Sequence, residues 1–388
     1  MIRVLHVAPG NLFGGIETLL VTLARLRDLC PSMEPEFAIC FEGRLQSELE
    51  AAGVPVHGLG ALKVRYPNTI WRARRRLAEL LRRRHPDVVI CHHAWTQAIL
   101  GPVVRAANIP LVFWLQGQTT GRHWSERWAA LTPPDLAICL SHFLTTELRT
   151  IYPDIAAHVV YNPVPPIAAL TDAARREVRA EIGTAPDAVV IAQACRMEPG
   201  KGARILLDAL GSIRDIADWE CWQIGGPQRA MEREYFDALR AQAARLGIDG
   251  RVRFWGQRGD VARLLAAADI YCQPNDTFRE GLGAVFIEAM RAGLPVVTTR
   301  LGAAPEVIDE TAGFLLAPGD AGAVAAALTE LIRDPALRAR LSAGGRARAE
   351  ARFSPAVQIP LLYEVLMKAV RGHPDPASSS GCRQPGLL

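Results

Sequence analysis

The chain has 388 residues, of which 49% are hydrophobic and 22% are charged, and its formal net charge is +4. This composition is typical of a folded globular protein and excludes disorder over most of the length. The length exceeds the roughly 200–300 residues that one hydrophobic core usually supports, so we expect two domains. So small a net charge gives no indication of nucleic-acid binding.

The cysteines and basic residues narrow the possible classes of protein further. The cysteines are scattered without a C-x-x-C pair, which favours reduced thiols over a disulfide framework or a zinc site. Among the 44 basic residues only Lys63, Lys201 and Lys368 are lysines, so arginine runs carry little functional information and each lysine carries more. There is no run of about 18 apolar residues and the N-terminus resembles a buried strand, so we expect a cytoplasmic protein.

Short β-branched segments alternate with helical stretches through the first half of the chain. This alternation is typical of βαβ units around a parallel sheet. We assign residues 1–168 to a first Rossmann-like domain. Its predicted strands are IRVLHVAP, EFAICFEG, DVVICHH, PLVFWLQG, LAICLS and HVVYNPV.

Two segments of this domain are candidates for contact with a ligand or a surface. In NLFGGIETLL, the Gly14–Gly15 pair would permit the backbone to approach a ligand closely, and a plain strand-to-helix turn is the alternative. The basic stretch WRARRRLAELLRRRHP at 71–86 is first interpreted as a solvated helix face. Its alternative is a peripheral contact with the inner face of a membrane. Nucleic-acid binding is not expected, because no aromatic-interleaved groove motif accompanies the arginines.

A Pro- and Ala-rich passage beginning at Pro165 resembles a linker, and the alternation then restarts. Residues 169–352 are predicted to form a second doubly wound α/β domain, and the two domains are expected to face a central cleft. A C-terminal helix at 353–371 is expected to pack back toward the first domain, and 372–388 has a disordered composition. The predicted strands are AVVIAQAC, ECWQIGG, RVRFWGQ, DIYCQPN, PVVTTR and GFLLAPG.

The segment FREGLGAVFIEAM contains two glutamates eight residues apart. On one helix they would be turned about 80° from each other and would not share a face. If the helix begins near Gly283 or Ala284, Glu280 lies in the loop and Glu288 in the second helical turn. Both can then point toward one ligand, although a solvated helix residue is the alternative for Glu288.

The backbone between these carboxylates suits an anion. The N–H groups of Gly281, Leu282 and Gly283 would lie at the positive end of the helix. A dinucleotide fingerprint is excluded, because Phe286 stands where a third glycine is required.

RMEPGKG places Arg196 and Lys201 directly after a predicted strand and before a helix. Glycines flank the lysine, so the loop can approach a ligand closely. This arrangement predicts a diphosphate clamp, with an ordinary exposed pair as the alternative.

Taken together, the motifs of the second half resemble glycosyltransferase family 4, whose members are retaining enzymes with the GT-B architecture. The resemblance covers about residues 186 to 320, and the pair Glu280 and Glu288 matches the family's E-x7-E motif. The matching motifs are RMEPGKG, QIGGP, VRFWGQ, ADIYCQPN, EGLGAVFIEAMRAGLPVVTTRLGAAPEVI and GFLLAPGD.

The resemblance implies roles for these residues. Arg196 and Lys201 would neutralise the diphosphate of a nucleotide-sugar donor, and Glu288 would accept hydrogen bonds from the ribose. Glu280 would hold the transferred sugar, and Gly256 would belong to the part that recognises the base.

One position departs from the family. Many members carry a histidine after the strand that corresponds to PLVFWLQG, where this chain has Gln116. A glutamine can donate and accept hydrogen bonds but cannot titrate. His92 and His93 are the nearest candidates to compensate, and a histidine of the core or of the cleft rim is the alternative.

The resemblance implies a hexosyltransferase that acts on a hydroxyl acceptor, either a glycan or a lipid-linked sugar, in cell-surface glycan or glycolipid synthesis. We expect no cofactor and no metal, because neither D-x-D nor a histidine ligand spacing is present. A nucleotide-sugar epimerase and a non-catalytic sugar-nucleotide-binding subunit are the alternatives.

Overall fold

A computed structural model describes residues 1–11, 14–227 and 230–373, and the chain divides into two compact units. Unit 1 comprises Met1–Pro163 and a C-terminal segment that begins at Pro355, and unit 2 comprises Val164–Ser354. The predicted domain borders lay at 168 and 352. Apart from its first two residues, the tail predicted at 372–388 lies outside the described residues.

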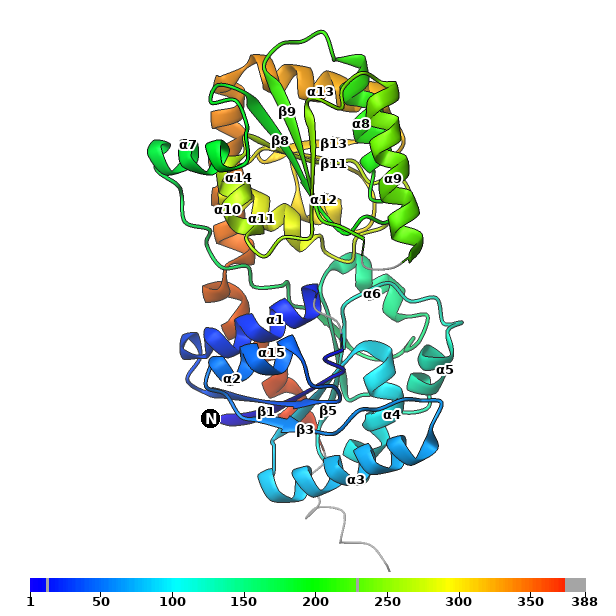
Figure 1. Cartoon of the computed structure of the whole chain (residues 1–388). Helices are drawn as coiled ribbons and strands as arrows, with labels where there is room; N and C mark the ends of the chain where they lie inside the picture. The colour runs from blue at the N-terminus through cyan, green and yellow to red at the C-terminus, as the bar shows by residue number, and fades with distance from the viewer. Residues whose placement is uncertain (12–13, 228–229, 374–388) are drawn as a thin grey trace, which may run out of the picture. The chain divides into compact units, whose positions relative to one another are not determined.

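Unit 1 contains a seven-stranded, wholly parallel sheet in the order β3-β2-β1-β4-β5-β6-β7 (Figure 1). The sequence analysis missed only β3, an edge strand too short to show an alternating pattern. The strands are β1 Ile2–Ala8, β2 Met33–Ile39, β3 Val56–Gly58, β4 Val88–His92, β5 Leu111–Leu115, β6 Leu136–Cys139 and β7 Ala157–Val159.

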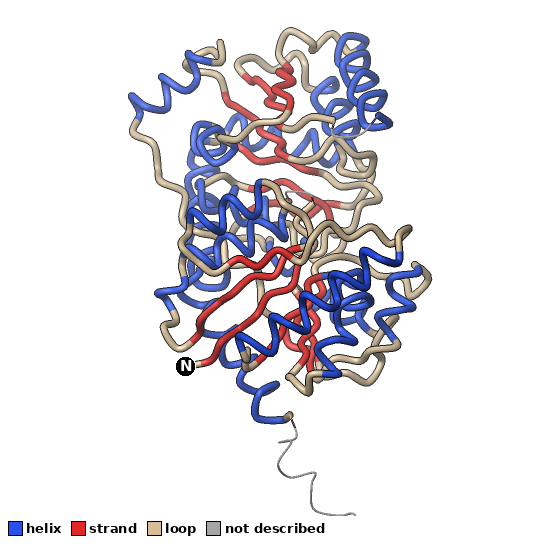
Figure 2. Tube along the Cα trace, turned by 60° about the horizontal axis from the view of Figure 1, so that its bottom comes forward, coloured by secondary structure: helices blue, strands red, loops and turns tan. Residues whose placement is uncertain are grey.

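Helices cover both faces of this sheet. Helices α1, α2 and α15 lie on one face, and α3, α4 and α5 lie on the other (Figures 1 and 2). The C-terminal helix α15 packs on β4 and β5, and the side-chain oxygen of Gln358 accepts a hydrogen bond from the Tyr161 N–H at 2.9 Å. The helices are α1 Gly15–Arg25, the 3-10 helix η1 Arg27–Leu29, α2 Arg44–Ala51, α3 Pro67–Arg84, α4 His93–Ala106, α5 Trp124–Ala130, α6 His142–Leu148 and α15 Pro355–Gly372.

Unit 2 contains a six-stranded parallel sheet in the order β10-β9-β8-β11-β12-β13, and every predicted strand of this half is present. Helices α8, α9 and α13 pack together on one face, and α7, α10, α11 and α14 on the other. The strands are β8 Val189–Ala194, β9 Trp219–Ile224, β10 Val252–Gly256, β11 Ile270–Gln273, β12 Val296–Thr299 and β13 Gly313–Leu316. The helices are α7 Asp172–Glu181, α8 Ala203–Ser212, α9 Ala230–Arg245, α10 Val261–Ala267, α11 Ala284–Ala292, α12 Ala304–Val307, α13 Ala321–Arg333 and α14 Pro335–Phe353.

Strand order reverses once in each sheet, between β1 and β4 in unit 1 and between β8 and β11 in unit 2. At such a point the connections leaving the two neighbouring strands diverge to opposite faces. This opens a crevice at the carboxyl ends of the strands, where ligands of open α/β sheets bind.

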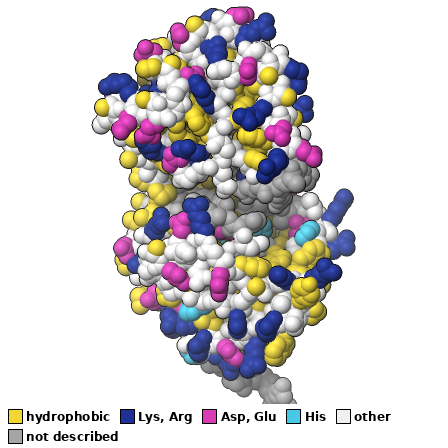
Figure 3. All heavy atoms as spheres, viewed as in Figure 1, with side chains coloured by type: hydrophobic (Ala, Val, Ile, Leu, Met, Phe, Trp, Pro, Cys, Tyr) yellow, Lys and Arg dark blue, Asp and Glu magenta, His cyan; other side chains and the backbone are white. Residues whose placement is uncertain are grey.

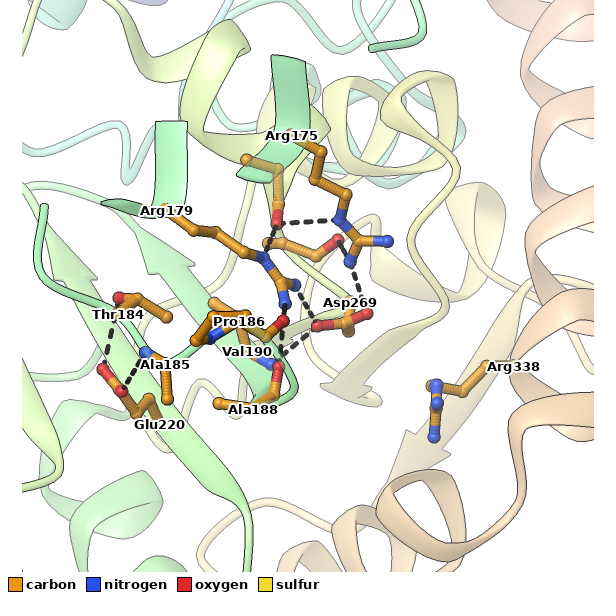
Figure 4. Close-up of polar contacts among 12 residues, drawn as sticks. Arg175, Arg179, Thr184, Ala185, Pro186, Ala188, Val190, Glu220, Asp269 and Arg338 are labelled. Carbon is orange, nitrogen blue, oxygen red and sulfur yellow. Dashed lines mark hydrogen bonds and ion pairs between the residues drawn. The ribbon is translucent and has the colours of Figure 1, made fainter. Parts of the chain in front are cut away.

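At the opposite, amino-terminal edge of the unit 2 sheet, Arg175 and Arg179 of α7 both point toward Asp269 (Figure 4). Each guanidinium lies 2.5 Å from one carboxylate oxygen, and the Val190 N–H donates to that carboxylate at 2.8 Å. Arg179 also donates to the Ala188 carbonyl at 2.9 Å. This network attaches α7, the first helix of unit 2, to the strands β8 and β11.

The chain enters and leaves unit 2 at neighbouring points. The Val164 N–H donates to the Phe353 carbonyl at 3.0 Å. Phe353 ends α14, and Ser354 adopts an extended conformation that separates this helix from α15. The C-terminal stretch that the sequence suggested as one helix from Phe353 onward therefore begins only at Pro355.

Candidate active site

The site predicted in unit 2 lies where strand order reverses. The loop after β8 and the loop after β11 approach each other so closely that a Cβ on Gly202 would lie 2.0 Å from the Pro274 carbonyl oxygen. Gly202 also has a φ of +79°, in the left-handed region that favours glycine. The RMEPGKG motif therefore needs its second flanking glycine for contact with the other loop.

Lys201 and Glu280, 79 residues apart in sequence, form the centre of the site. The Lys201 ammonium lies 2.6 Å from Oε1 of Glu280 and 3.6 Å from the centre of the Phe278 ring. Lys201 is only 8% exposed, which argues against the alternative of an ordinary exposed residue. Because burial of an unpaired ammonium is costly, the carboxylate and the aromatic face together stabilise it.

Gln273, at the end of β11, holds the Glu280 carboxylate from the other side. Its amide nitrogen donates to Oε1 of Glu280 at 2.9 Å and to Oδ1 of Asn275 at 3.0 Å. Its amide oxygen accepts a hydrogen bond from the Tyr271 hydroxyl at 2.7 Å. The sequence analysis missed this residue, although a polar side chain at the end of an apolar strand could have indicated it.

The backbone of Glu280 is also fixed. The Ala303 N–H donates to the Glu280 carbonyl at 2.9 Å, and a Cβ on Gly302 would lie 2.4 Å from the same oxygen. Gly302 has a φ of +59°. The loop after β12 thus packs directly on Glu280, so loops after three strands determine where this carboxylate lies.

Glu288 lies in α11, which begins at Ala284 with Gly283 as its N-cap at a φ of +80°. The prediction that the helix begins here, with Glu280 in the loop before it, is confirmed. Among the residues that the structure describes, none donates a hydrogen bond to the Glu288 carboxylate, and burial raises its pKa. Glu288 is therefore a partly buried acceptor that its surroundings leave unsatisfied.

The two glutamates share a neighbour. Burial raises the pKa of the Tyr271 phenol well above its usual value, and the charges of Glu280 and Glu288 add to the rise. Both carboxylates therefore lie near the end of β11. Leu282, which lies between them in the chain, is buried, with only 3% of its surface exposed.

Arg196 already has a partner. Its guanidinium lies 2.8 Å from the Glu198 carboxylate, and its side chain is 48% exposed. Arg196, Glu198, Lys201 and Glu280 all influence the thiol of Cys195, whose pKa burial raises to about 12. Two cations and two carboxylates thus gather at the end of β8, and each cation is paired with a carboxylate.

Family models match both halves of the chain. The model described as Glycosyltransferase Family 4 matches residues 13–166, and the model described as Glycosyl transferases group 1 matches residues 188–334. The chain belongs to glycosyltransferase family 4. Its two doubly wound parallel units are the GT-B architecture of that family, as predicted.

Curated relatives of this glycosyltransferase include two lipid mannosyltransferases. A GDP-mannose-dependent monoacylated alpha-(1-6)-phosphatidylinositol monomannoside mannosyltransferase of Corynebacterium glutamicum is 25% identical over 92% of this chain and 95% of its own. A phosphatidyl-myo-inositol mannosyltransferase of Mycobacterium leprae is 39% identical, but over only 44% of each protein. Among solved structures, Anabaena HepE in complex with UDP and glucose has a TM-score of 0.81 and 24% identity, over 95% of this chain and all of its own.

In unit 1 of this family 4 glycosyltransferase, the glycine loop leads into α1. Gly14 is the N-cap of the helix, and its N–H donates to Oε2 of Glu17 at 3.0 Å. A Cβ on Gly15 would meet no atom within 4 Å, so the backbone is open to an approaching group there. Leu12 and Phe13 of this loop lie outside the described residues.

The structure argues against the predicted sugar contact of His92. This residue is fully buried, with Nε2 3.0 Å from Nδ1 of His6 and its ring stacked near Trp114 at 5.4 Å. Burial lowers the pKa of His92 well below its ordinary value, and His6 adds to this effect. The side chain completes the core at the end of β4, so it corresponds to the alternative of a core histidine.

His93 is exposed and begins α4 with a φ of +77°, which is unfavourable for any residue except glycine. Gln116 lies next to His92. Both atoms of the Gln116 amide are shielded from solvent, and neither makes a well-formed hydrogen bond within the described part of the chain. Of the three candidates at these strand ends, His93 is the one whose side chain is accessible.

Gly256 ends β10 with a φ of +65°, and its carbonyl accepts a hydrogen bond from the Gly225 N–H at 2.8 Å. A Cβ on Gly256 would meet nothing within 4 Å. The glycine therefore leaves an open surface at the same edge of the sheet as Lys201 and Glu280, two strands away from β8.

Proposed function

We propose that this glycosyltransferase moves a hexose from a nucleotide diphosphate sugar to a hydroxyl acceptor with retention of the anomeric configuration. The observation that carries the proposal is the Lys201–Glu280 pair at the strand reversal, because it joins a cation for phosphate to a carboxylate for sugar hydroxyls. UDP and glucose bound to HepE and the mannosyl donors of the relatives are consistent with this donor class.

The donor would be held at both ends. Lys201 and Arg196 neutralise the diphosphate, and the N-terminus of α11 adds its positive partial charge. Glu280 accepts hydrogen bonds from the hydroxyls of the transferred sugar. Glu288, which has no donor within the described protein, accepts them from the ribose.

Because Lys201 and Arg196 are already paired with carboxylates, each must share or exchange its partner when the donor diphosphate binds. An ammonium carries three N–H groups, so Lys201 can contact a phosphate oxygen while one N–H remains on Glu280. Arg196 has an exposed guanidinium and can turn from Glu198 to the phosphate. The charge that develops on the leaving diphosphate is then stabilised most when the glycosidic bond breaks.

Retention follows from attack on the face that the diphosphate leaves. We infer an oxocarbenium-like transition state in which a non-bridging oxygen of the leaving phosphate accepts the proton of the acceptor hydroxyl. Glu280 orients the sugar and stabilises its positive charge. No metal enters this scheme, so addition of EDTA should leave turnover unchanged, and recovery of lost activity by Mg²⁺ alone would contradict it.

A donor screen tests the function. The full chain is titrated with UDP-hexoses and GDP-hexoses while its thermal unfolding is followed, because a bound donor raises stability according to its affinity. Nucleotide diphosphate should then be released only when a hydroxyl acceptor is added. Interconversion of donor sugars without acceptor would instead identify an epimerase, and donor binding without any turnover would identify a binding subunit.

The structure contains no helix, within its described residues, of the length and apolarity that crossing a bilayer requires. We also propose that unit 1 docks peripherally on an anionic membrane, where a lipid-linked acceptor would reside. Exposed large hydrophobic side chains support this. They lie on α3, on α5 or directly beside them: Tyr66 (51% exposed), Trp71 (61%), Trp124 (36%), Trp128 (47%) and Leu131 (81%).

Figure 3 shows hydrophobic side chains beside Lys and Arg side chains over α3 and α5. Trp and Tyr favour the membrane interface. Each basic residue near an anionic surface contributes about 1 kcal/mol. The arginines that the sequence analysis interpreted first as a solvated face would then lie next to aromatic anchors that it did not predict.

Vesicle sedimentation tests the docking. A Trp124→Ser/Trp128→Ser double variant should bind phosphatidylglycerol vesicles about tenfold or more weakly, which corresponds to about 1.4 kcal/mol. Leu29→Ser is the matched control, since Leu29 is also exposed but belongs to η1 on the other face of the sheet. Equal binding by the double variant and the wild type would contradict docking through these tryptophans, and equal binding to phosphatidylcholine would contradict the preference for an anionic membrane.

A further inference from the structure

A cavity of about 400 Å³ in unit 1 lies at the carboxyl ends of β2 and β3. The segment Cys40–Glu42 after β2 forms one wall, and Gly58 and Gly60 form another. Arg76 of α3 reaches it from the side. Arg76 belongs to the basic stretch 71–86 noted in the sequence, but the cavity itself could not be predicted, because its residues come from separate segments.

Glycines create the space. A Cβ on Gly58 would meet no atom within 4 Å, so a side chain there would project into open space. Gly60 has a φ of +84°, and a Cβ on it would lie 2.4 Å from Nη1 of Arg76. The guanidinium therefore lies directly over Gly60, whose positive φ favours glycine at this position.

The cavity contains charge that the protein leaves uncompensated. Within the described residues, Arg76 forms no ion pair, whereas the next residue, Arg75, pairs with Glu79 at 3.1 Å. Glu42 at the rim likewise has no ion-pair partner in the described chain. Cys40 is neutral, since burial raises the pKa of its thiol to about 12. The cavity thus offers one open guanidinium and one carboxylate acceptor.

The position of the cavity relates it to the glycine loop. The N–H groups of Cys40 and Phe41 donate to the Pro9 carbonyl at 3.1 and 3.0 Å. A Cβ on Gly10 would lie 3.0 Å from the Phe41 carbonyl oxygen. The wall of the cavity is therefore bonded to the segment that leads from β1 to Gly14 and Gly15, near the strand reversal of this sheet.

We propose that this cavity binds a phosphate group of the acceptor. Arg76 presents a planar fork that matches two phosphate oxygens, and Glu42 accepts a hydrogen bond from a neighbouring acceptor hydroxyl. The assignment rests on the proposed transferase function and adds to it the acceptor class, a phosphate ester that also carries hydroxyls. The phosphate belongs either to a soluble sugar phosphate or to a lipid headgroup.

Calorimetric titration of the full chain tests the proposal, with the unit 2 site filled by saturating nucleotide diphosphate. Glucose 6-phosphate and dihexanoyl phosphatidylglycerol below its micelle concentration are the two phosphate probes, and glucose is the neutral one. At least one phosphate probe should bind about tenfold more tightly than glucose. Binding of the first alone indicates a soluble acceptor, and binding of the second alone indicates a lipid headgroup.

Variants localise the binding. Arg76→Gln should remove the preference for phosphate over glucose, and Gly58→Val should weaken every probe by filling the space. Arg75→Gln, whose guanidinium is paired with Glu79, should bind like the wild type. An unchanged Arg76→Gln variant, or an equal loss in Arg75→Gln, would overturn the proposal.

The titration is repeated without nucleotide. If no nucleotide sugar binds the wild type, the proposed transfer reaction fails, but the Arg76-dependent preference for phosphate still decides whether the cavity is a phosphate site. Unchanged affinity of Arg76→Gln for glucose, which binds the same cavity, would show that unit 1 of the variant is folded.

Discussion

The two edges of the unit 2 sheet both carry buried or partly buried ion pairs, but they complete them differently. At the amino-terminal edge, Arg179 is held by Asp269 and by backbone carbonyls that cannot move away. At the carboxyl edge, Lys201 is held by Glu280 and an aromatic ring, and Glu288 has no described donor. A fully satisfied network stabilises the fold, whereas a partly satisfied one is available to a ligand.

The largest expected effect lies at the satisfied edge. Asp269→Ala leaves two arginines without their carboxylate, one of them buried, and should lower the free energy of unfolding by about 3–5 kcal/mol. Urea denaturation measures this. Asp215→Ala is the control, because Asp215 is 95% exposed and its contact with Arg214 is 3.9 Å long, so its effect should stay within about 0.5 kcal/mol. Similar losses of unfolding free energy in both variants would show that the Asp269 network contributes no more to stability than an exposed ion pair.

Glu280→Gln should change turnover without changing the fold. The amide keeps the shape of the carboxylate but loses the charge that stabilises the sugar in the transition state, so we expect kcat to fall about 10²- to 10³-fold. Nucleotide affinity should change little. Glu310→Gln, at an exposed position, is the control for loss of one negative charge. Wild-type turnover in Glu280→Gln would remove this residue from the mechanism.

Lys201→Ala should weaken the affinity for nucleotide diphosphate about 10- to 100-fold, since a charge-assisted hydrogen bond contributes about 1.5–3 kcal/mol. Affinity for the corresponding nucleoside, which has no phosphate, should not change, and the ratio of the two separates loss of the clamp from misfolding. Lys201→Arg should recover part of the affinity. A parallel decrease for nucleoside and nucleotide would contradict the assignment.

The smallest effect is expected at Glu288, where one substitution should change stability and nucleotide binding in opposite directions. Burial raises the pKa of Glu288 above its ordinary value of 4.5, so ionisation costs folding free energy as the pH rises through the raised pKa. Glu288→Gln should therefore be more stable than the wild type at neutral pH, and the difference should disappear below pH 4.5. The same variant should bind nucleotide about five- to tenfold more weakly. A gain in both properties would exclude a ribose contact.

The local sequence pattern was sufficient to predict much of the fold. Apolar segments predicted all strands except β3, and the glycines around residue 283 placed the start of α11, which in turn separated Glu280 from Glu288. These features depend on neighbouring residues in the chain.

Contacts between distant segments were not predictable in this way. The Lys201–Glu280 bond, the support from Gln273 and the packing of Gly302 on Glu280 depend on which strands become neighbours. The sequence left two positions open for His92, because a histidine at a strand end can face either the core or the solvent, and the stack with His6 and Trp114 favours the core.

The hydrogen bond between Val164 and Phe353 brings the two ends of unit 2 together, so unit 2 resembles an insertion between the two chain segments of unit 1. Its two ends are joined by one hydrogen bond, so the segment Val164–Ser354 (the cassette) can be removed or exchanged as one unit without separating strands that pair with each other. Such a cassette would carry Lys201, Glu280 and Glu288 while the acceptor cavity stayed behind. Exchange of cassettes between related chains would be a route by which donor preference changes independently of the acceptor.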